Sequence, residues 1–184
     1  MAVLKGPLRG LLLPLFTASL FCASAGAQPP TEHDIKAVFL YKFTNFVEWP
    51  DSTWQGSEPF RLCVLADGPM TAAVERTMHG ETINGRPSQT MAPATARDAR
   101  RCHILFVGHT EMERGASMLA AIRDLPVLTV GEAEGFLSGG GAIEFVREGN
   151  RVRFDINVET ARRAGLNISA RLLQVARHVE GKPR

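Results

Sequence analysis

The sequence lacks the short motifs that identify several common classes of enzyme. None of its five histidines lies in an H-x-H or H-E-x-x-H pattern, and no G-x-S-x-G segment places a nucleophilic serine. The glycine triplet at 139–141 precedes an apolar segment, whereas a phosphate-binding loop follows a strand and opens a helix. We therefore expect no catalytic residues and no nucleotide-binding loop, and binding is a better hypothesis than chemistry.

Charge is scarce in the first 27 residues, where Lys5 and Arg9 are the charged side chains. An uncharged apolar run follows at 11–25, and residues 25–27 (AGA) resemble a signal-peptidase site. This three-part layout is typical of a secretory signal peptide. A membrane anchor is the alternative, but the run is short for a span of about 30 Å of hydrocarbon and contains Pro14. We expect a signal peptide at 1–27, cleaved near Ala27, and a single domain at 28–184.

The remaining chain has no excess of charge of either sign. Two of the 21 Lys and Arg residues belong to the leader, which leaves 19 basic residues against 19 Asp and Glu residues. Binding to nucleic acid needs a basic stripe that neutralises phosphates, and a neutral chain does not supply one. We therefore exclude DNA and RNA as partners.

Cysteine is also scarce, with three residues in the chain, of which Cys63 and Cys102 follow the leader. An even number of cysteines in an exported protein favours a disulfide, which here would close a loop of about 40 residues and contribute roughly 3–4 kcal/mol. Two free, buried cysteines are the alternative. No His or Cys pair lies at the spacing of zinc ligands, so we expect no metal and no cofactor.

Apolar runs separated by helical segments predict the fold class. Residues 104–107 (ILFV) do not alternate with polar residues, which is typical of a strand buried on both faces of a parallel sheet. Further strands are expected at 60–66, 88–92 and 126–130, with helices at 70–78, 94–101 and 112–122. Residues 142–147 and 151–157 flank a Glu-Gly-Asn turn, and the second segment alternates strictly. We predict a three-layer α/β/α sandwich with a mostly parallel sheet and a C-terminal antiparallel hairpin at one edge.

Three more helices are expected at the two ends of the domain. Thr31 is the predicted N-cap of the first, which ends at Trp49-Pro50. Its core-facing stripe comprises Ile35, Phe39, Phe43, Phe46 and Val47. Asn157 is expected to cap a helix at 158–164, and the last helix, at 169–179, is expected to turn Leu172, Leu173, Val175 and Ala176 inward.

Polar residues after the central strand form the first candidate site. Ligands of open α/β sheets bind beyond the carboxyl ends of strands, where His109 and Glu111 are expected. Helix capping by Thr110 is the competing interpretation. A catalytic pair of His103 and Glu111 is a weaker hypothesis than a hydrogen-bonded structural histidine. Arg171, Arg177 and His178, on the exposed side of the last predicted helix, form the second candidate site.

Several segments, in the same order, resemble the YfiR family of periplasmic proteins. They are residues 35–43 (IKAVFLYKF), 46–50 (FVEWP), 83–87 (INGRP), 102–108 (CHILFVG), 152–157 (VRFDIN), 161–166 (ARRAGL) and 168–169 (IS). The similarity extends over nearly the whole chain after the leader, and 152–157 is its strongest part. Each segment is weak by itself, but together they are specific.

The resemblance implies a periplasmic regulatory protein with an α/β/α fold, usually a homodimer. Such a protein would bind and inhibit the periplasmic domain of an inner-membrane diguanylate cyclase, and so lower cyclic di-GMP and favour motile over biofilm growth. Release would come from an outer-membrane lipoprotein or a redox change. The family's cysteine pair falls on Cys63 and Cys102, whereas a second pair found in some members is missing. The alternative function is a periplasmic small-molecule sensor that binds its ligand near His109 or near Arg171, Arg177 and His178.

Overall fold

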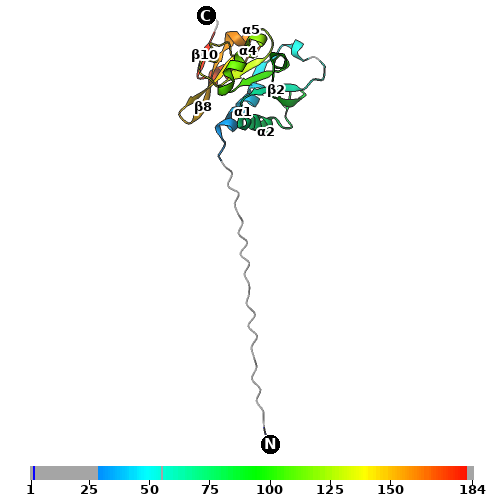
Figure 1. The fold of residues 1–184 in the computed structure, drawn as a ribbon, viewed down its shortest axis with the longest axis vertical. Helices are drawn as coiled ribbons and strands as arrows, with labels where there is room; N and C mark the ends of the chain where they lie inside the picture. Colours follow the sequence, from blue (N-terminus) through cyan, green and yellow to red (C-terminus); the bar gives the residue numbers. More distant parts are fainter. Residues whose placement is uncertain (1, 3–28, 55, 182–184) are drawn as a thin grey trace.

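A curled sheet of eight strands forms the centre of the molecule (Figure 1). The structure, a computed structural model, describes residue 2 and residues 29–54 and 56–181, so the predicted signal peptide at 1–27 lies outside the described residues except for residue 2. The strands are ordered β10-β8-β7-β6-β5-β2-β4-β3. Their bounds are β2 Phe60–Leu65, β3 Thr82–Ile83, β4 Arg86–Met91, β5 Ile104–Val107, β6 Leu128–Gly131, β7 Ile143–Glu148, β8 Arg151–Asn157 and β10 His178–Glu180.

The middle of this sheet is parallel, as predicted. Strand β5 lies between β2 and β6 and is parallel to both, and β4 and β7 continue the parallel arrangement on either side. All four residues of β5 are buried, which explains why its sequence is continuously apolar. Strand β8 is antiparallel to β7, and β3 is antiparallel to β4. Strands β1 (Val47–Glu48) and β9 (Asn167–Ile168) form a separate antiparallel pair.

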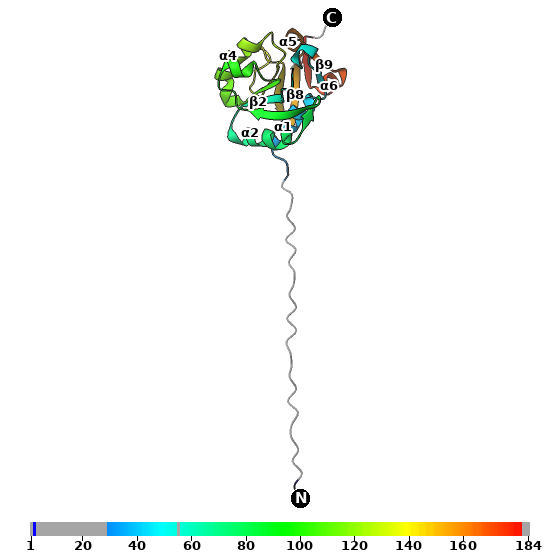
Figure 2. The same cartoon turned by 90° about the vertical axis from the view of Figure 1, so that its right-hand side faces the viewer.

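Helices cover both faces, which confirms the three-layer arrangement. Helices α1 (Glu32–Phe43) and α2 (Gly68–Met78) lie side by side on one face, and α4 (Met112–Ile122) lies on the other, with the short α3 (Ala96–Ala99) beside it (Figure 2). Alternate side chains of β5 divide between the two layers, since Ile104 and Phe106 pack with α1 and α2, whereas Leu105 and Val107 pack with α3 and α4. The remaining helices are α5 (Val158–Arg163), α6 (Ala170–Val175) and two 3-10 turns, Asp51–Thr53 and His109–Glu111. Within the described ranges, no helix is long and apolar enough to cross a membrane.

Helix α1 begins as predicted but ends earlier. Thr31 caps it, and Thr31 and Asp34 form a reciprocal capping box. The helix stops at Phe43 rather than at Trp49, because residues 44–46 turn and Val47 enters the small β1–β9 pair. The predicted stripe is therefore partly wrong. The side chains that α1 buries belong to Lys36, Ala37, Leu40 and Phe43, while Ile35, Phe39 and Phe46 are half-buried.

The C-terminal segment differs most from the prediction. Asn157 caps α5 as expected, but the last helix ends at Val175, and residues 178–180 form β10 parallel to β8. The hairpin of β7 and β8 is consequently not the edge of the sheet, because β10 pairs with the strand edge that β8 would otherwise expose. The face of β8 that was predicted to be wet is only partly so, since Arg151 is exposed and Arg153 is half-buried, whereas Asp155 is buried against Arg177. Val175 was predicted to point inward but is 58% exposed.

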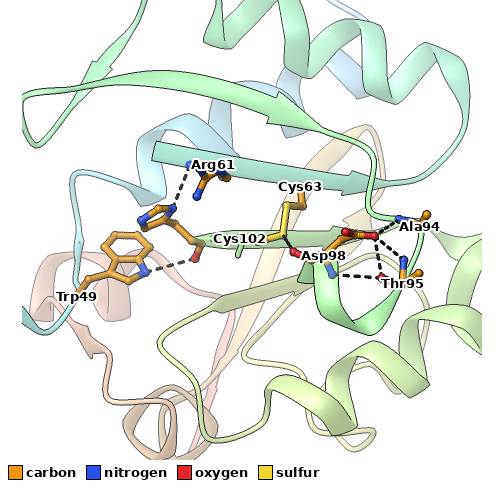
Figure 3. The surroundings of a disulfide bond; sticks show 8 residues. Trp49, Arg61, Cys63, Ala94, Thr95, Asp98 and Cys102 are labelled. Atoms are coloured by element: carbon orange, nitrogen blue, oxygen red, sulfur yellow. Dashed lines mark hydrogen bonds between the residues drawn. A yellow bond between two sulfur atoms is a disulfide. The ribbon is translucent and has the colours of Figure 1, made fainter. Parts of the chain in front are cut away.

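A disulfide joins Cys63 and Cys102 across neighbouring strands (Figure 3). Cys63 lies inside β2, Cys102 lies just before β5, and their Cα atoms are 5.8 Å apart, within the normal range for a bridge. Both residues are buried in the layer that contains α3 and α4. The bridge therefore ties the α3–β5 connection to the centre of the sheet.

Candidate functional site

An apolar groove between α1 and α6 is the main candidate site. It has a volume of about 470 Å³. Val38 of α1 is 47% exposed and Val175 of α6 is 58% exposed; they are the large apolar side chains most open to solvent among the described residues, and both line the groove. The other apolar lining residues are Pro30, Ile35, Phe39, Phe43, Phe46, Phe154 and Leu172.

Packed aromatic rings make the floor of this groove rigid. Phe43 and Phe154 meet edge to face with ring centroids 5.2 Å apart, and Phe39 meets Phe154 at 5.5 Å. Phe145 lies behind them, 5.9 Å from Phe43. Such pairs contribute roughly 0.5–1.5 kcal/mol each beyond the area they bury, so the floor is well ordered before anything binds.

Charged side chains stand at the rim of the apolar groove. Asp34 and Lys42 line it on α1, and hydrogen bonds from Thr31 and Arg76 lower the pKa of Asp34 to about 2, so its carboxylate stays ionised. Arg171 precedes Val175 by one helical turn and therefore shares its side of α6. An apolar centre with a charged rim is the usual composition of a protein interface.

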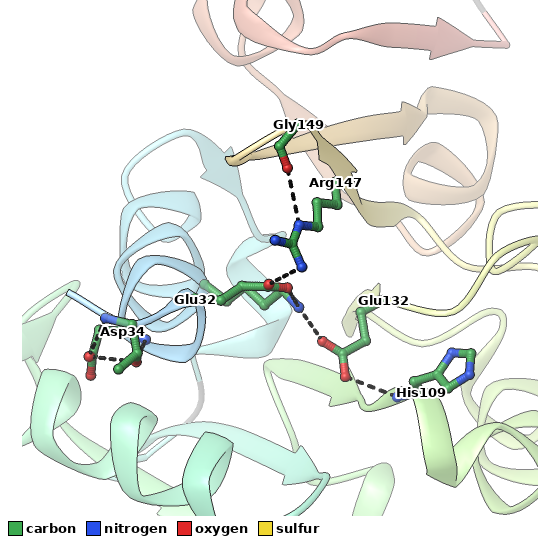
Figure 4. Close-up of polar contacts among 8 residues, drawn as sticks. Glu32, Asp34, His109, Glu132, Arg147 and Gly149 are labelled. Atoms are coloured by element: carbon green, nitrogen blue, oxygen red, sulfur yellow. Dashed lines mark hydrogen bonds and ion pairs between the residues drawn. The ribbon is translucent and has the colours of Figure 1, made fainter. Parts of the chain in front are cut away.

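His109, one of the predicted site residues, lies beyond the carboxyl end of β5, where a network of the protein's own charges occupies the position expected for a ligand (Figure 4). The backbone N–H of His109 donates to Glu132 at 3.0 Å, and Lys36 donates to the other oxygen of Glu132 at 2.6 Å. Lys36 also pairs with Glu32 at 2.6 Å, and Arg147 lies 3.7 Å from Glu32. Burial opposes the charge of Lys36, but its hydrogen bonds to Glu132 and Glu32 outweigh burial and raise its pKa.

The remaining predicted site residues are dispersed. Glu111 pairs with Arg114 on the next helix turn, and Thr110 does not cap α4, since neither its 3-10 turn nor α4 has a side-chain cap. Arg177 forms a two-pronged ion pair with the buried Asp155, and this hydrogen bonding raises the pKa of Arg177. His178 is exposed on β10. The structure does not bring Arg171, Arg177 and His178 together as residues of one helix face, because the helix ends before Arg177.

His103 is a buried structural residue rather than half of a catalytic pair. Its Nδ1 accepts the backbone N–H of Arg61 at 3.0 Å, its carbonyl accepts the Trp49 indole N–H at 3.3 Å, and its ring stacks on Trp54 with centroids 5.4 Å apart. Burial, together with the positive charges of Arg61 and Arg86, lowers the pKa of His103 to about 4. The ring is therefore neutral near pH 7.

Acid should destabilise the protein through His103. Its pKa rises from about 4 in the fold to 6.5 in the unfolded chain, so the unfolded state takes up the proton first as the pH falls. This contribution to stability is complete above pH 6.5 and is lost progressively down to pH 4. Urea unfolding at about pH 7 and about pH 5 measures this contribution of His103 to stability. The wild type is compared with His103→Asn, which keeps a hydrogen-bond acceptor but does not titrate. An equal loss of stability in both proteins would contradict the assignment.

The sequence matches a protein-family model over most of its length. A family model described as YfiR/HmsC-like matches residues 33–177. The chain belongs to the YfiR/HmsC-like family. Membership in this family indicates a periplasmic regulator of diguanylate cyclase signalling rather than an enzyme. No curated protein sequence matches the chain.

A solved structure with the same fold has low sequence identity to this chain. A conserved domain protein from Vibrio cholerae O1 biovar El Tor str. N16961 matches with a TM-score of 0.56 and 9% identity over 82% of this chain. The match covers 60% of that protein, so the YfiR/HmsC-like chain spans about three fifths of its length. The ABC domain in complex with L-Trp from Streptococcus pneumonia matches with a TM-score of 0.47 and 13% identity, over 65% of this chain and 55% of that one.

Sequence reasoning missed the apolar groove of this YfiR/HmsC-like protein. The available signal was Val38, which lies outside the predicted stripe of α1 and makes that helix apolar on more than one side. Val175 gave no such signal, because its exposure depends on α6 ending where it does. Lys36 and Glu132 are 96 residues apart, so no spacing rule links them. Among the described residues, no group of His, Cys, Asp and Glu has the arrangement of a metal site.

Proposed function

We propose that this protein binds the periplasmic domain of an inner-membrane diguanylate cyclase and holds the cyclase inactive, which lowers cyclic di-GMP. Membership in the YfiR/HmsC-like family supports the signalling context. The observation that supports a binding role is the apolar groove, where Val38 and Val175 remain exposed over an ordered aromatic floor. Exposed apolar patches rimmed by polar groups mark protein interaction sites.

The proposed occupant of the groove is an apolar segment of the cyclase's periplasmic domain. The groove has a volume of about 470 Å³ and so would hold a few side chains rather than a broad face. Lys42 offers a positive charge at its rim, whereas Asp34 is already paired with Arg76, which favours a partner segment with an acidic residue beside its apolar ones. The predicted site residue Arg171 would contribute at the same rim. His109, Glu111, Arg177 and His178 are not needed for this contact.

Charges placed in the groove should abolish capture of the cyclase. We expect the double variant Val38→Glu and Val175→Glu to retain less than about a tenth of the wild-type yield, because an unpaired carboxylate buried against aromatic rings costs several kcal/mol. The measurement is co-purification of full-length membrane cyclases from the source organism's membranes with the tagged mature protein. The double variant Ala116→Glu and Ala120→Glu, at exposed positions of α4 in the opposite layer, is the matched control.

Two results would count against this proposal. If the wild type enriches no cyclase, the inhibitory partnership is wrong. If the wild type and the groove variant enrich a cyclase equally, the partnership stands but the groove is not its interface.

A homodimer and release by an outer-membrane lipoprotein complete the proposed system and rest on family membership alone. Sedimentation of the mature chain tests the dimer.

A further inference from the structure

A second depression lies where the parallel strands begin, at the opposite ends of these strands from His109. It has a volume of about 670 Å³. Arg61 is at the start of β2, Arg86 opens β4, and Arg100 and Arg101 precede β5. The apolar segment at 125–127 leads into β6 and forms another part of the wall. We call this depression the arginine groove.

The arginine groove has an excess of positive charge. Glu58 is the carboxylate among its lining residues, and it pairs with Arg61, whose side chain is only 9% exposed. Arg86 donates to the carbonyls of Glu58 at 2.8 Å and Trp54 at 2.9 Å, so it is held in place without being neutralised. Neither Arg100 nor Arg101 forms an ion pair with a described residue.

The charges are also held on a rigid frame. The disulfide fixes Cys102, directly after Arg101, to the middle of β2 (Figure 3). On the other side, Thr95 and Asp98 form a reciprocal capping box that holds α3, which leads directly into Arg100. Because this backbone is already ordered, a ligand would have to order the exposed side chains of Arg100 and Arg101 but not the chain that carries them. His103, buried in the wall, is neutral near pH 7 and contributes no charge of its own.

From this arrangement we propose that the arginine groove binds a small multivalent oxyanion, either a phosphate ester or a polycarboxylate. Arg86, Arg100 and Arg101 would receive the anionic oxygens, because a guanidinium group donates in a planar fork that matches both phosphate and carboxylate. The apolar segment at 125–127 would contact the carbon part of the ligand. A volume of about 670 Å³ is in the range of small-molecule sites. Neither the sequence motifs nor the family match assigns this groove a role, and the inference does not rest on the cyclase proposal.

Titration calorimetry of the mature, disulfide-bonded protein at low salt tests this proposal. The probes are glucose 6-phosphate, with glucose as its uncharged match, and citrate, with glycerol as its uncharged match. We expect one of the two anions to bind and neither neutral compound to do so, and the anion that binds identifies the class. Changing Arg100→Gln and Arg101→Gln together should weaken binding at least about tenfold, as expected for the loss of charge-assisted hydrogen bonds.

The matched control removes the same net charge elsewhere. Arg97→Gln and Arg162→Gln change exposed arginines on α3 and α5 that do not line the groove, and this double variant should bind as the wild type does. If neither anion binds, or if both double variants lose affinity equally, the arginine groove is not a specific site. Because the assay contains no cyclase, its result is independent of the capture experiment.

Discussion

Replacing Cys63 with serine is expected to lower the free energy of unfolding by about 3–4 kcal/mol, because the disulfide to Cys102 closes a loop across 39 positions and restricts the unfolded chain. Both half-cystines are buried, at 0% and 4% exposure, so the variant also places a hydroxyl in an apolar layer. Urea unfolding of the mature protein, followed by tryptophan fluorescence, measures the change. Mass spectrometry without reductant should identify the Cys63–Cys102 linked peptide.

The double variant Cys63→Ala and Cys102→Ala is the control for this prediction. Reductant should lower the free energy of unfolding of the wild type toward that of this variant. The free energy of unfolding of the variant itself should not change with reductant. Two freely alkylated thiols in protein isolated from the periplasm would show that the bridge does not form there. If the linked peptide is present but reductant does not change the stability of the wild type, the bridge adds no stability.

Replacing Gly141 with alanine is expected to cost about 1–3 kcal/mol through overpacking, near the upper end of that range because the obstacle is a fully buried ring. Phe136 is 0% exposed, and an added Cβ at Gly141 would lie 2.1 Å from its Cδ1. Gly131 meets the other side of the same ring, with its added Cβ 2.3 Å from Cδ2. The ring is thus enclosed between two positions that have no side chain. Chemical denaturation of Gly141→Ala measures the cost.

Gly139 supplies a matched control two residues away. A Cβ at Gly139 would meet only backbone oxygens at 3.5 Å, which is ordinary contact, so Gly139→Ala should be close to neutral. Adding Phe136→Leu to Gly141→Ala should recover part of the lost stability, since a smaller side chain leaves room for the new methyl group. Similar losses for Gly139→Ala and Gly141→Ala would point to backbone flexibility rather than to the Phe136 ring as the cause.

Local chemistry made some elements predictable. The Thr31 cap, the Asn157 cap and the buried β5 strand each depend on residues within a few positions of one another, and the structure has all three. The end of α1 was not predictable in this way. Residues 46–47 continue the apolar period of the helix, but Val47 pairs with Ile168, more than a hundred residues later, and forms a strand. Here a distant partner overrode the local period.

The candidate sites show the same difference between what local sequence predicts and what distant contacts decide. Spacing brought His109 and Glu111 to the carboxyl end of β5, but it could not show that Glu132 and Lys36 already occupy that place. The apolar groove needs α1 and α6 to meet over Phe154, and the arginine groove needs the beginnings of β2, β4 and β5 to lie together. Each depends on contacts between segments that are far apart in the chain.

The amino-acid sequence by itself determined the layered α/β class of this protein, its central parallel strands and its family resemblance, because these follow from short-range periodicity and from motifs that can be read in order. The tertiary structure alone decided that β10 pairs with the outer edge of the hairpin, that Val38 and Val175 stay exposed beside one groove, and that Gly131 and Gly141 enclose Phe136. The physical reason is that burial and charge compensation depend on which distant segments come into contact, and the local sequence does not specify those contacts.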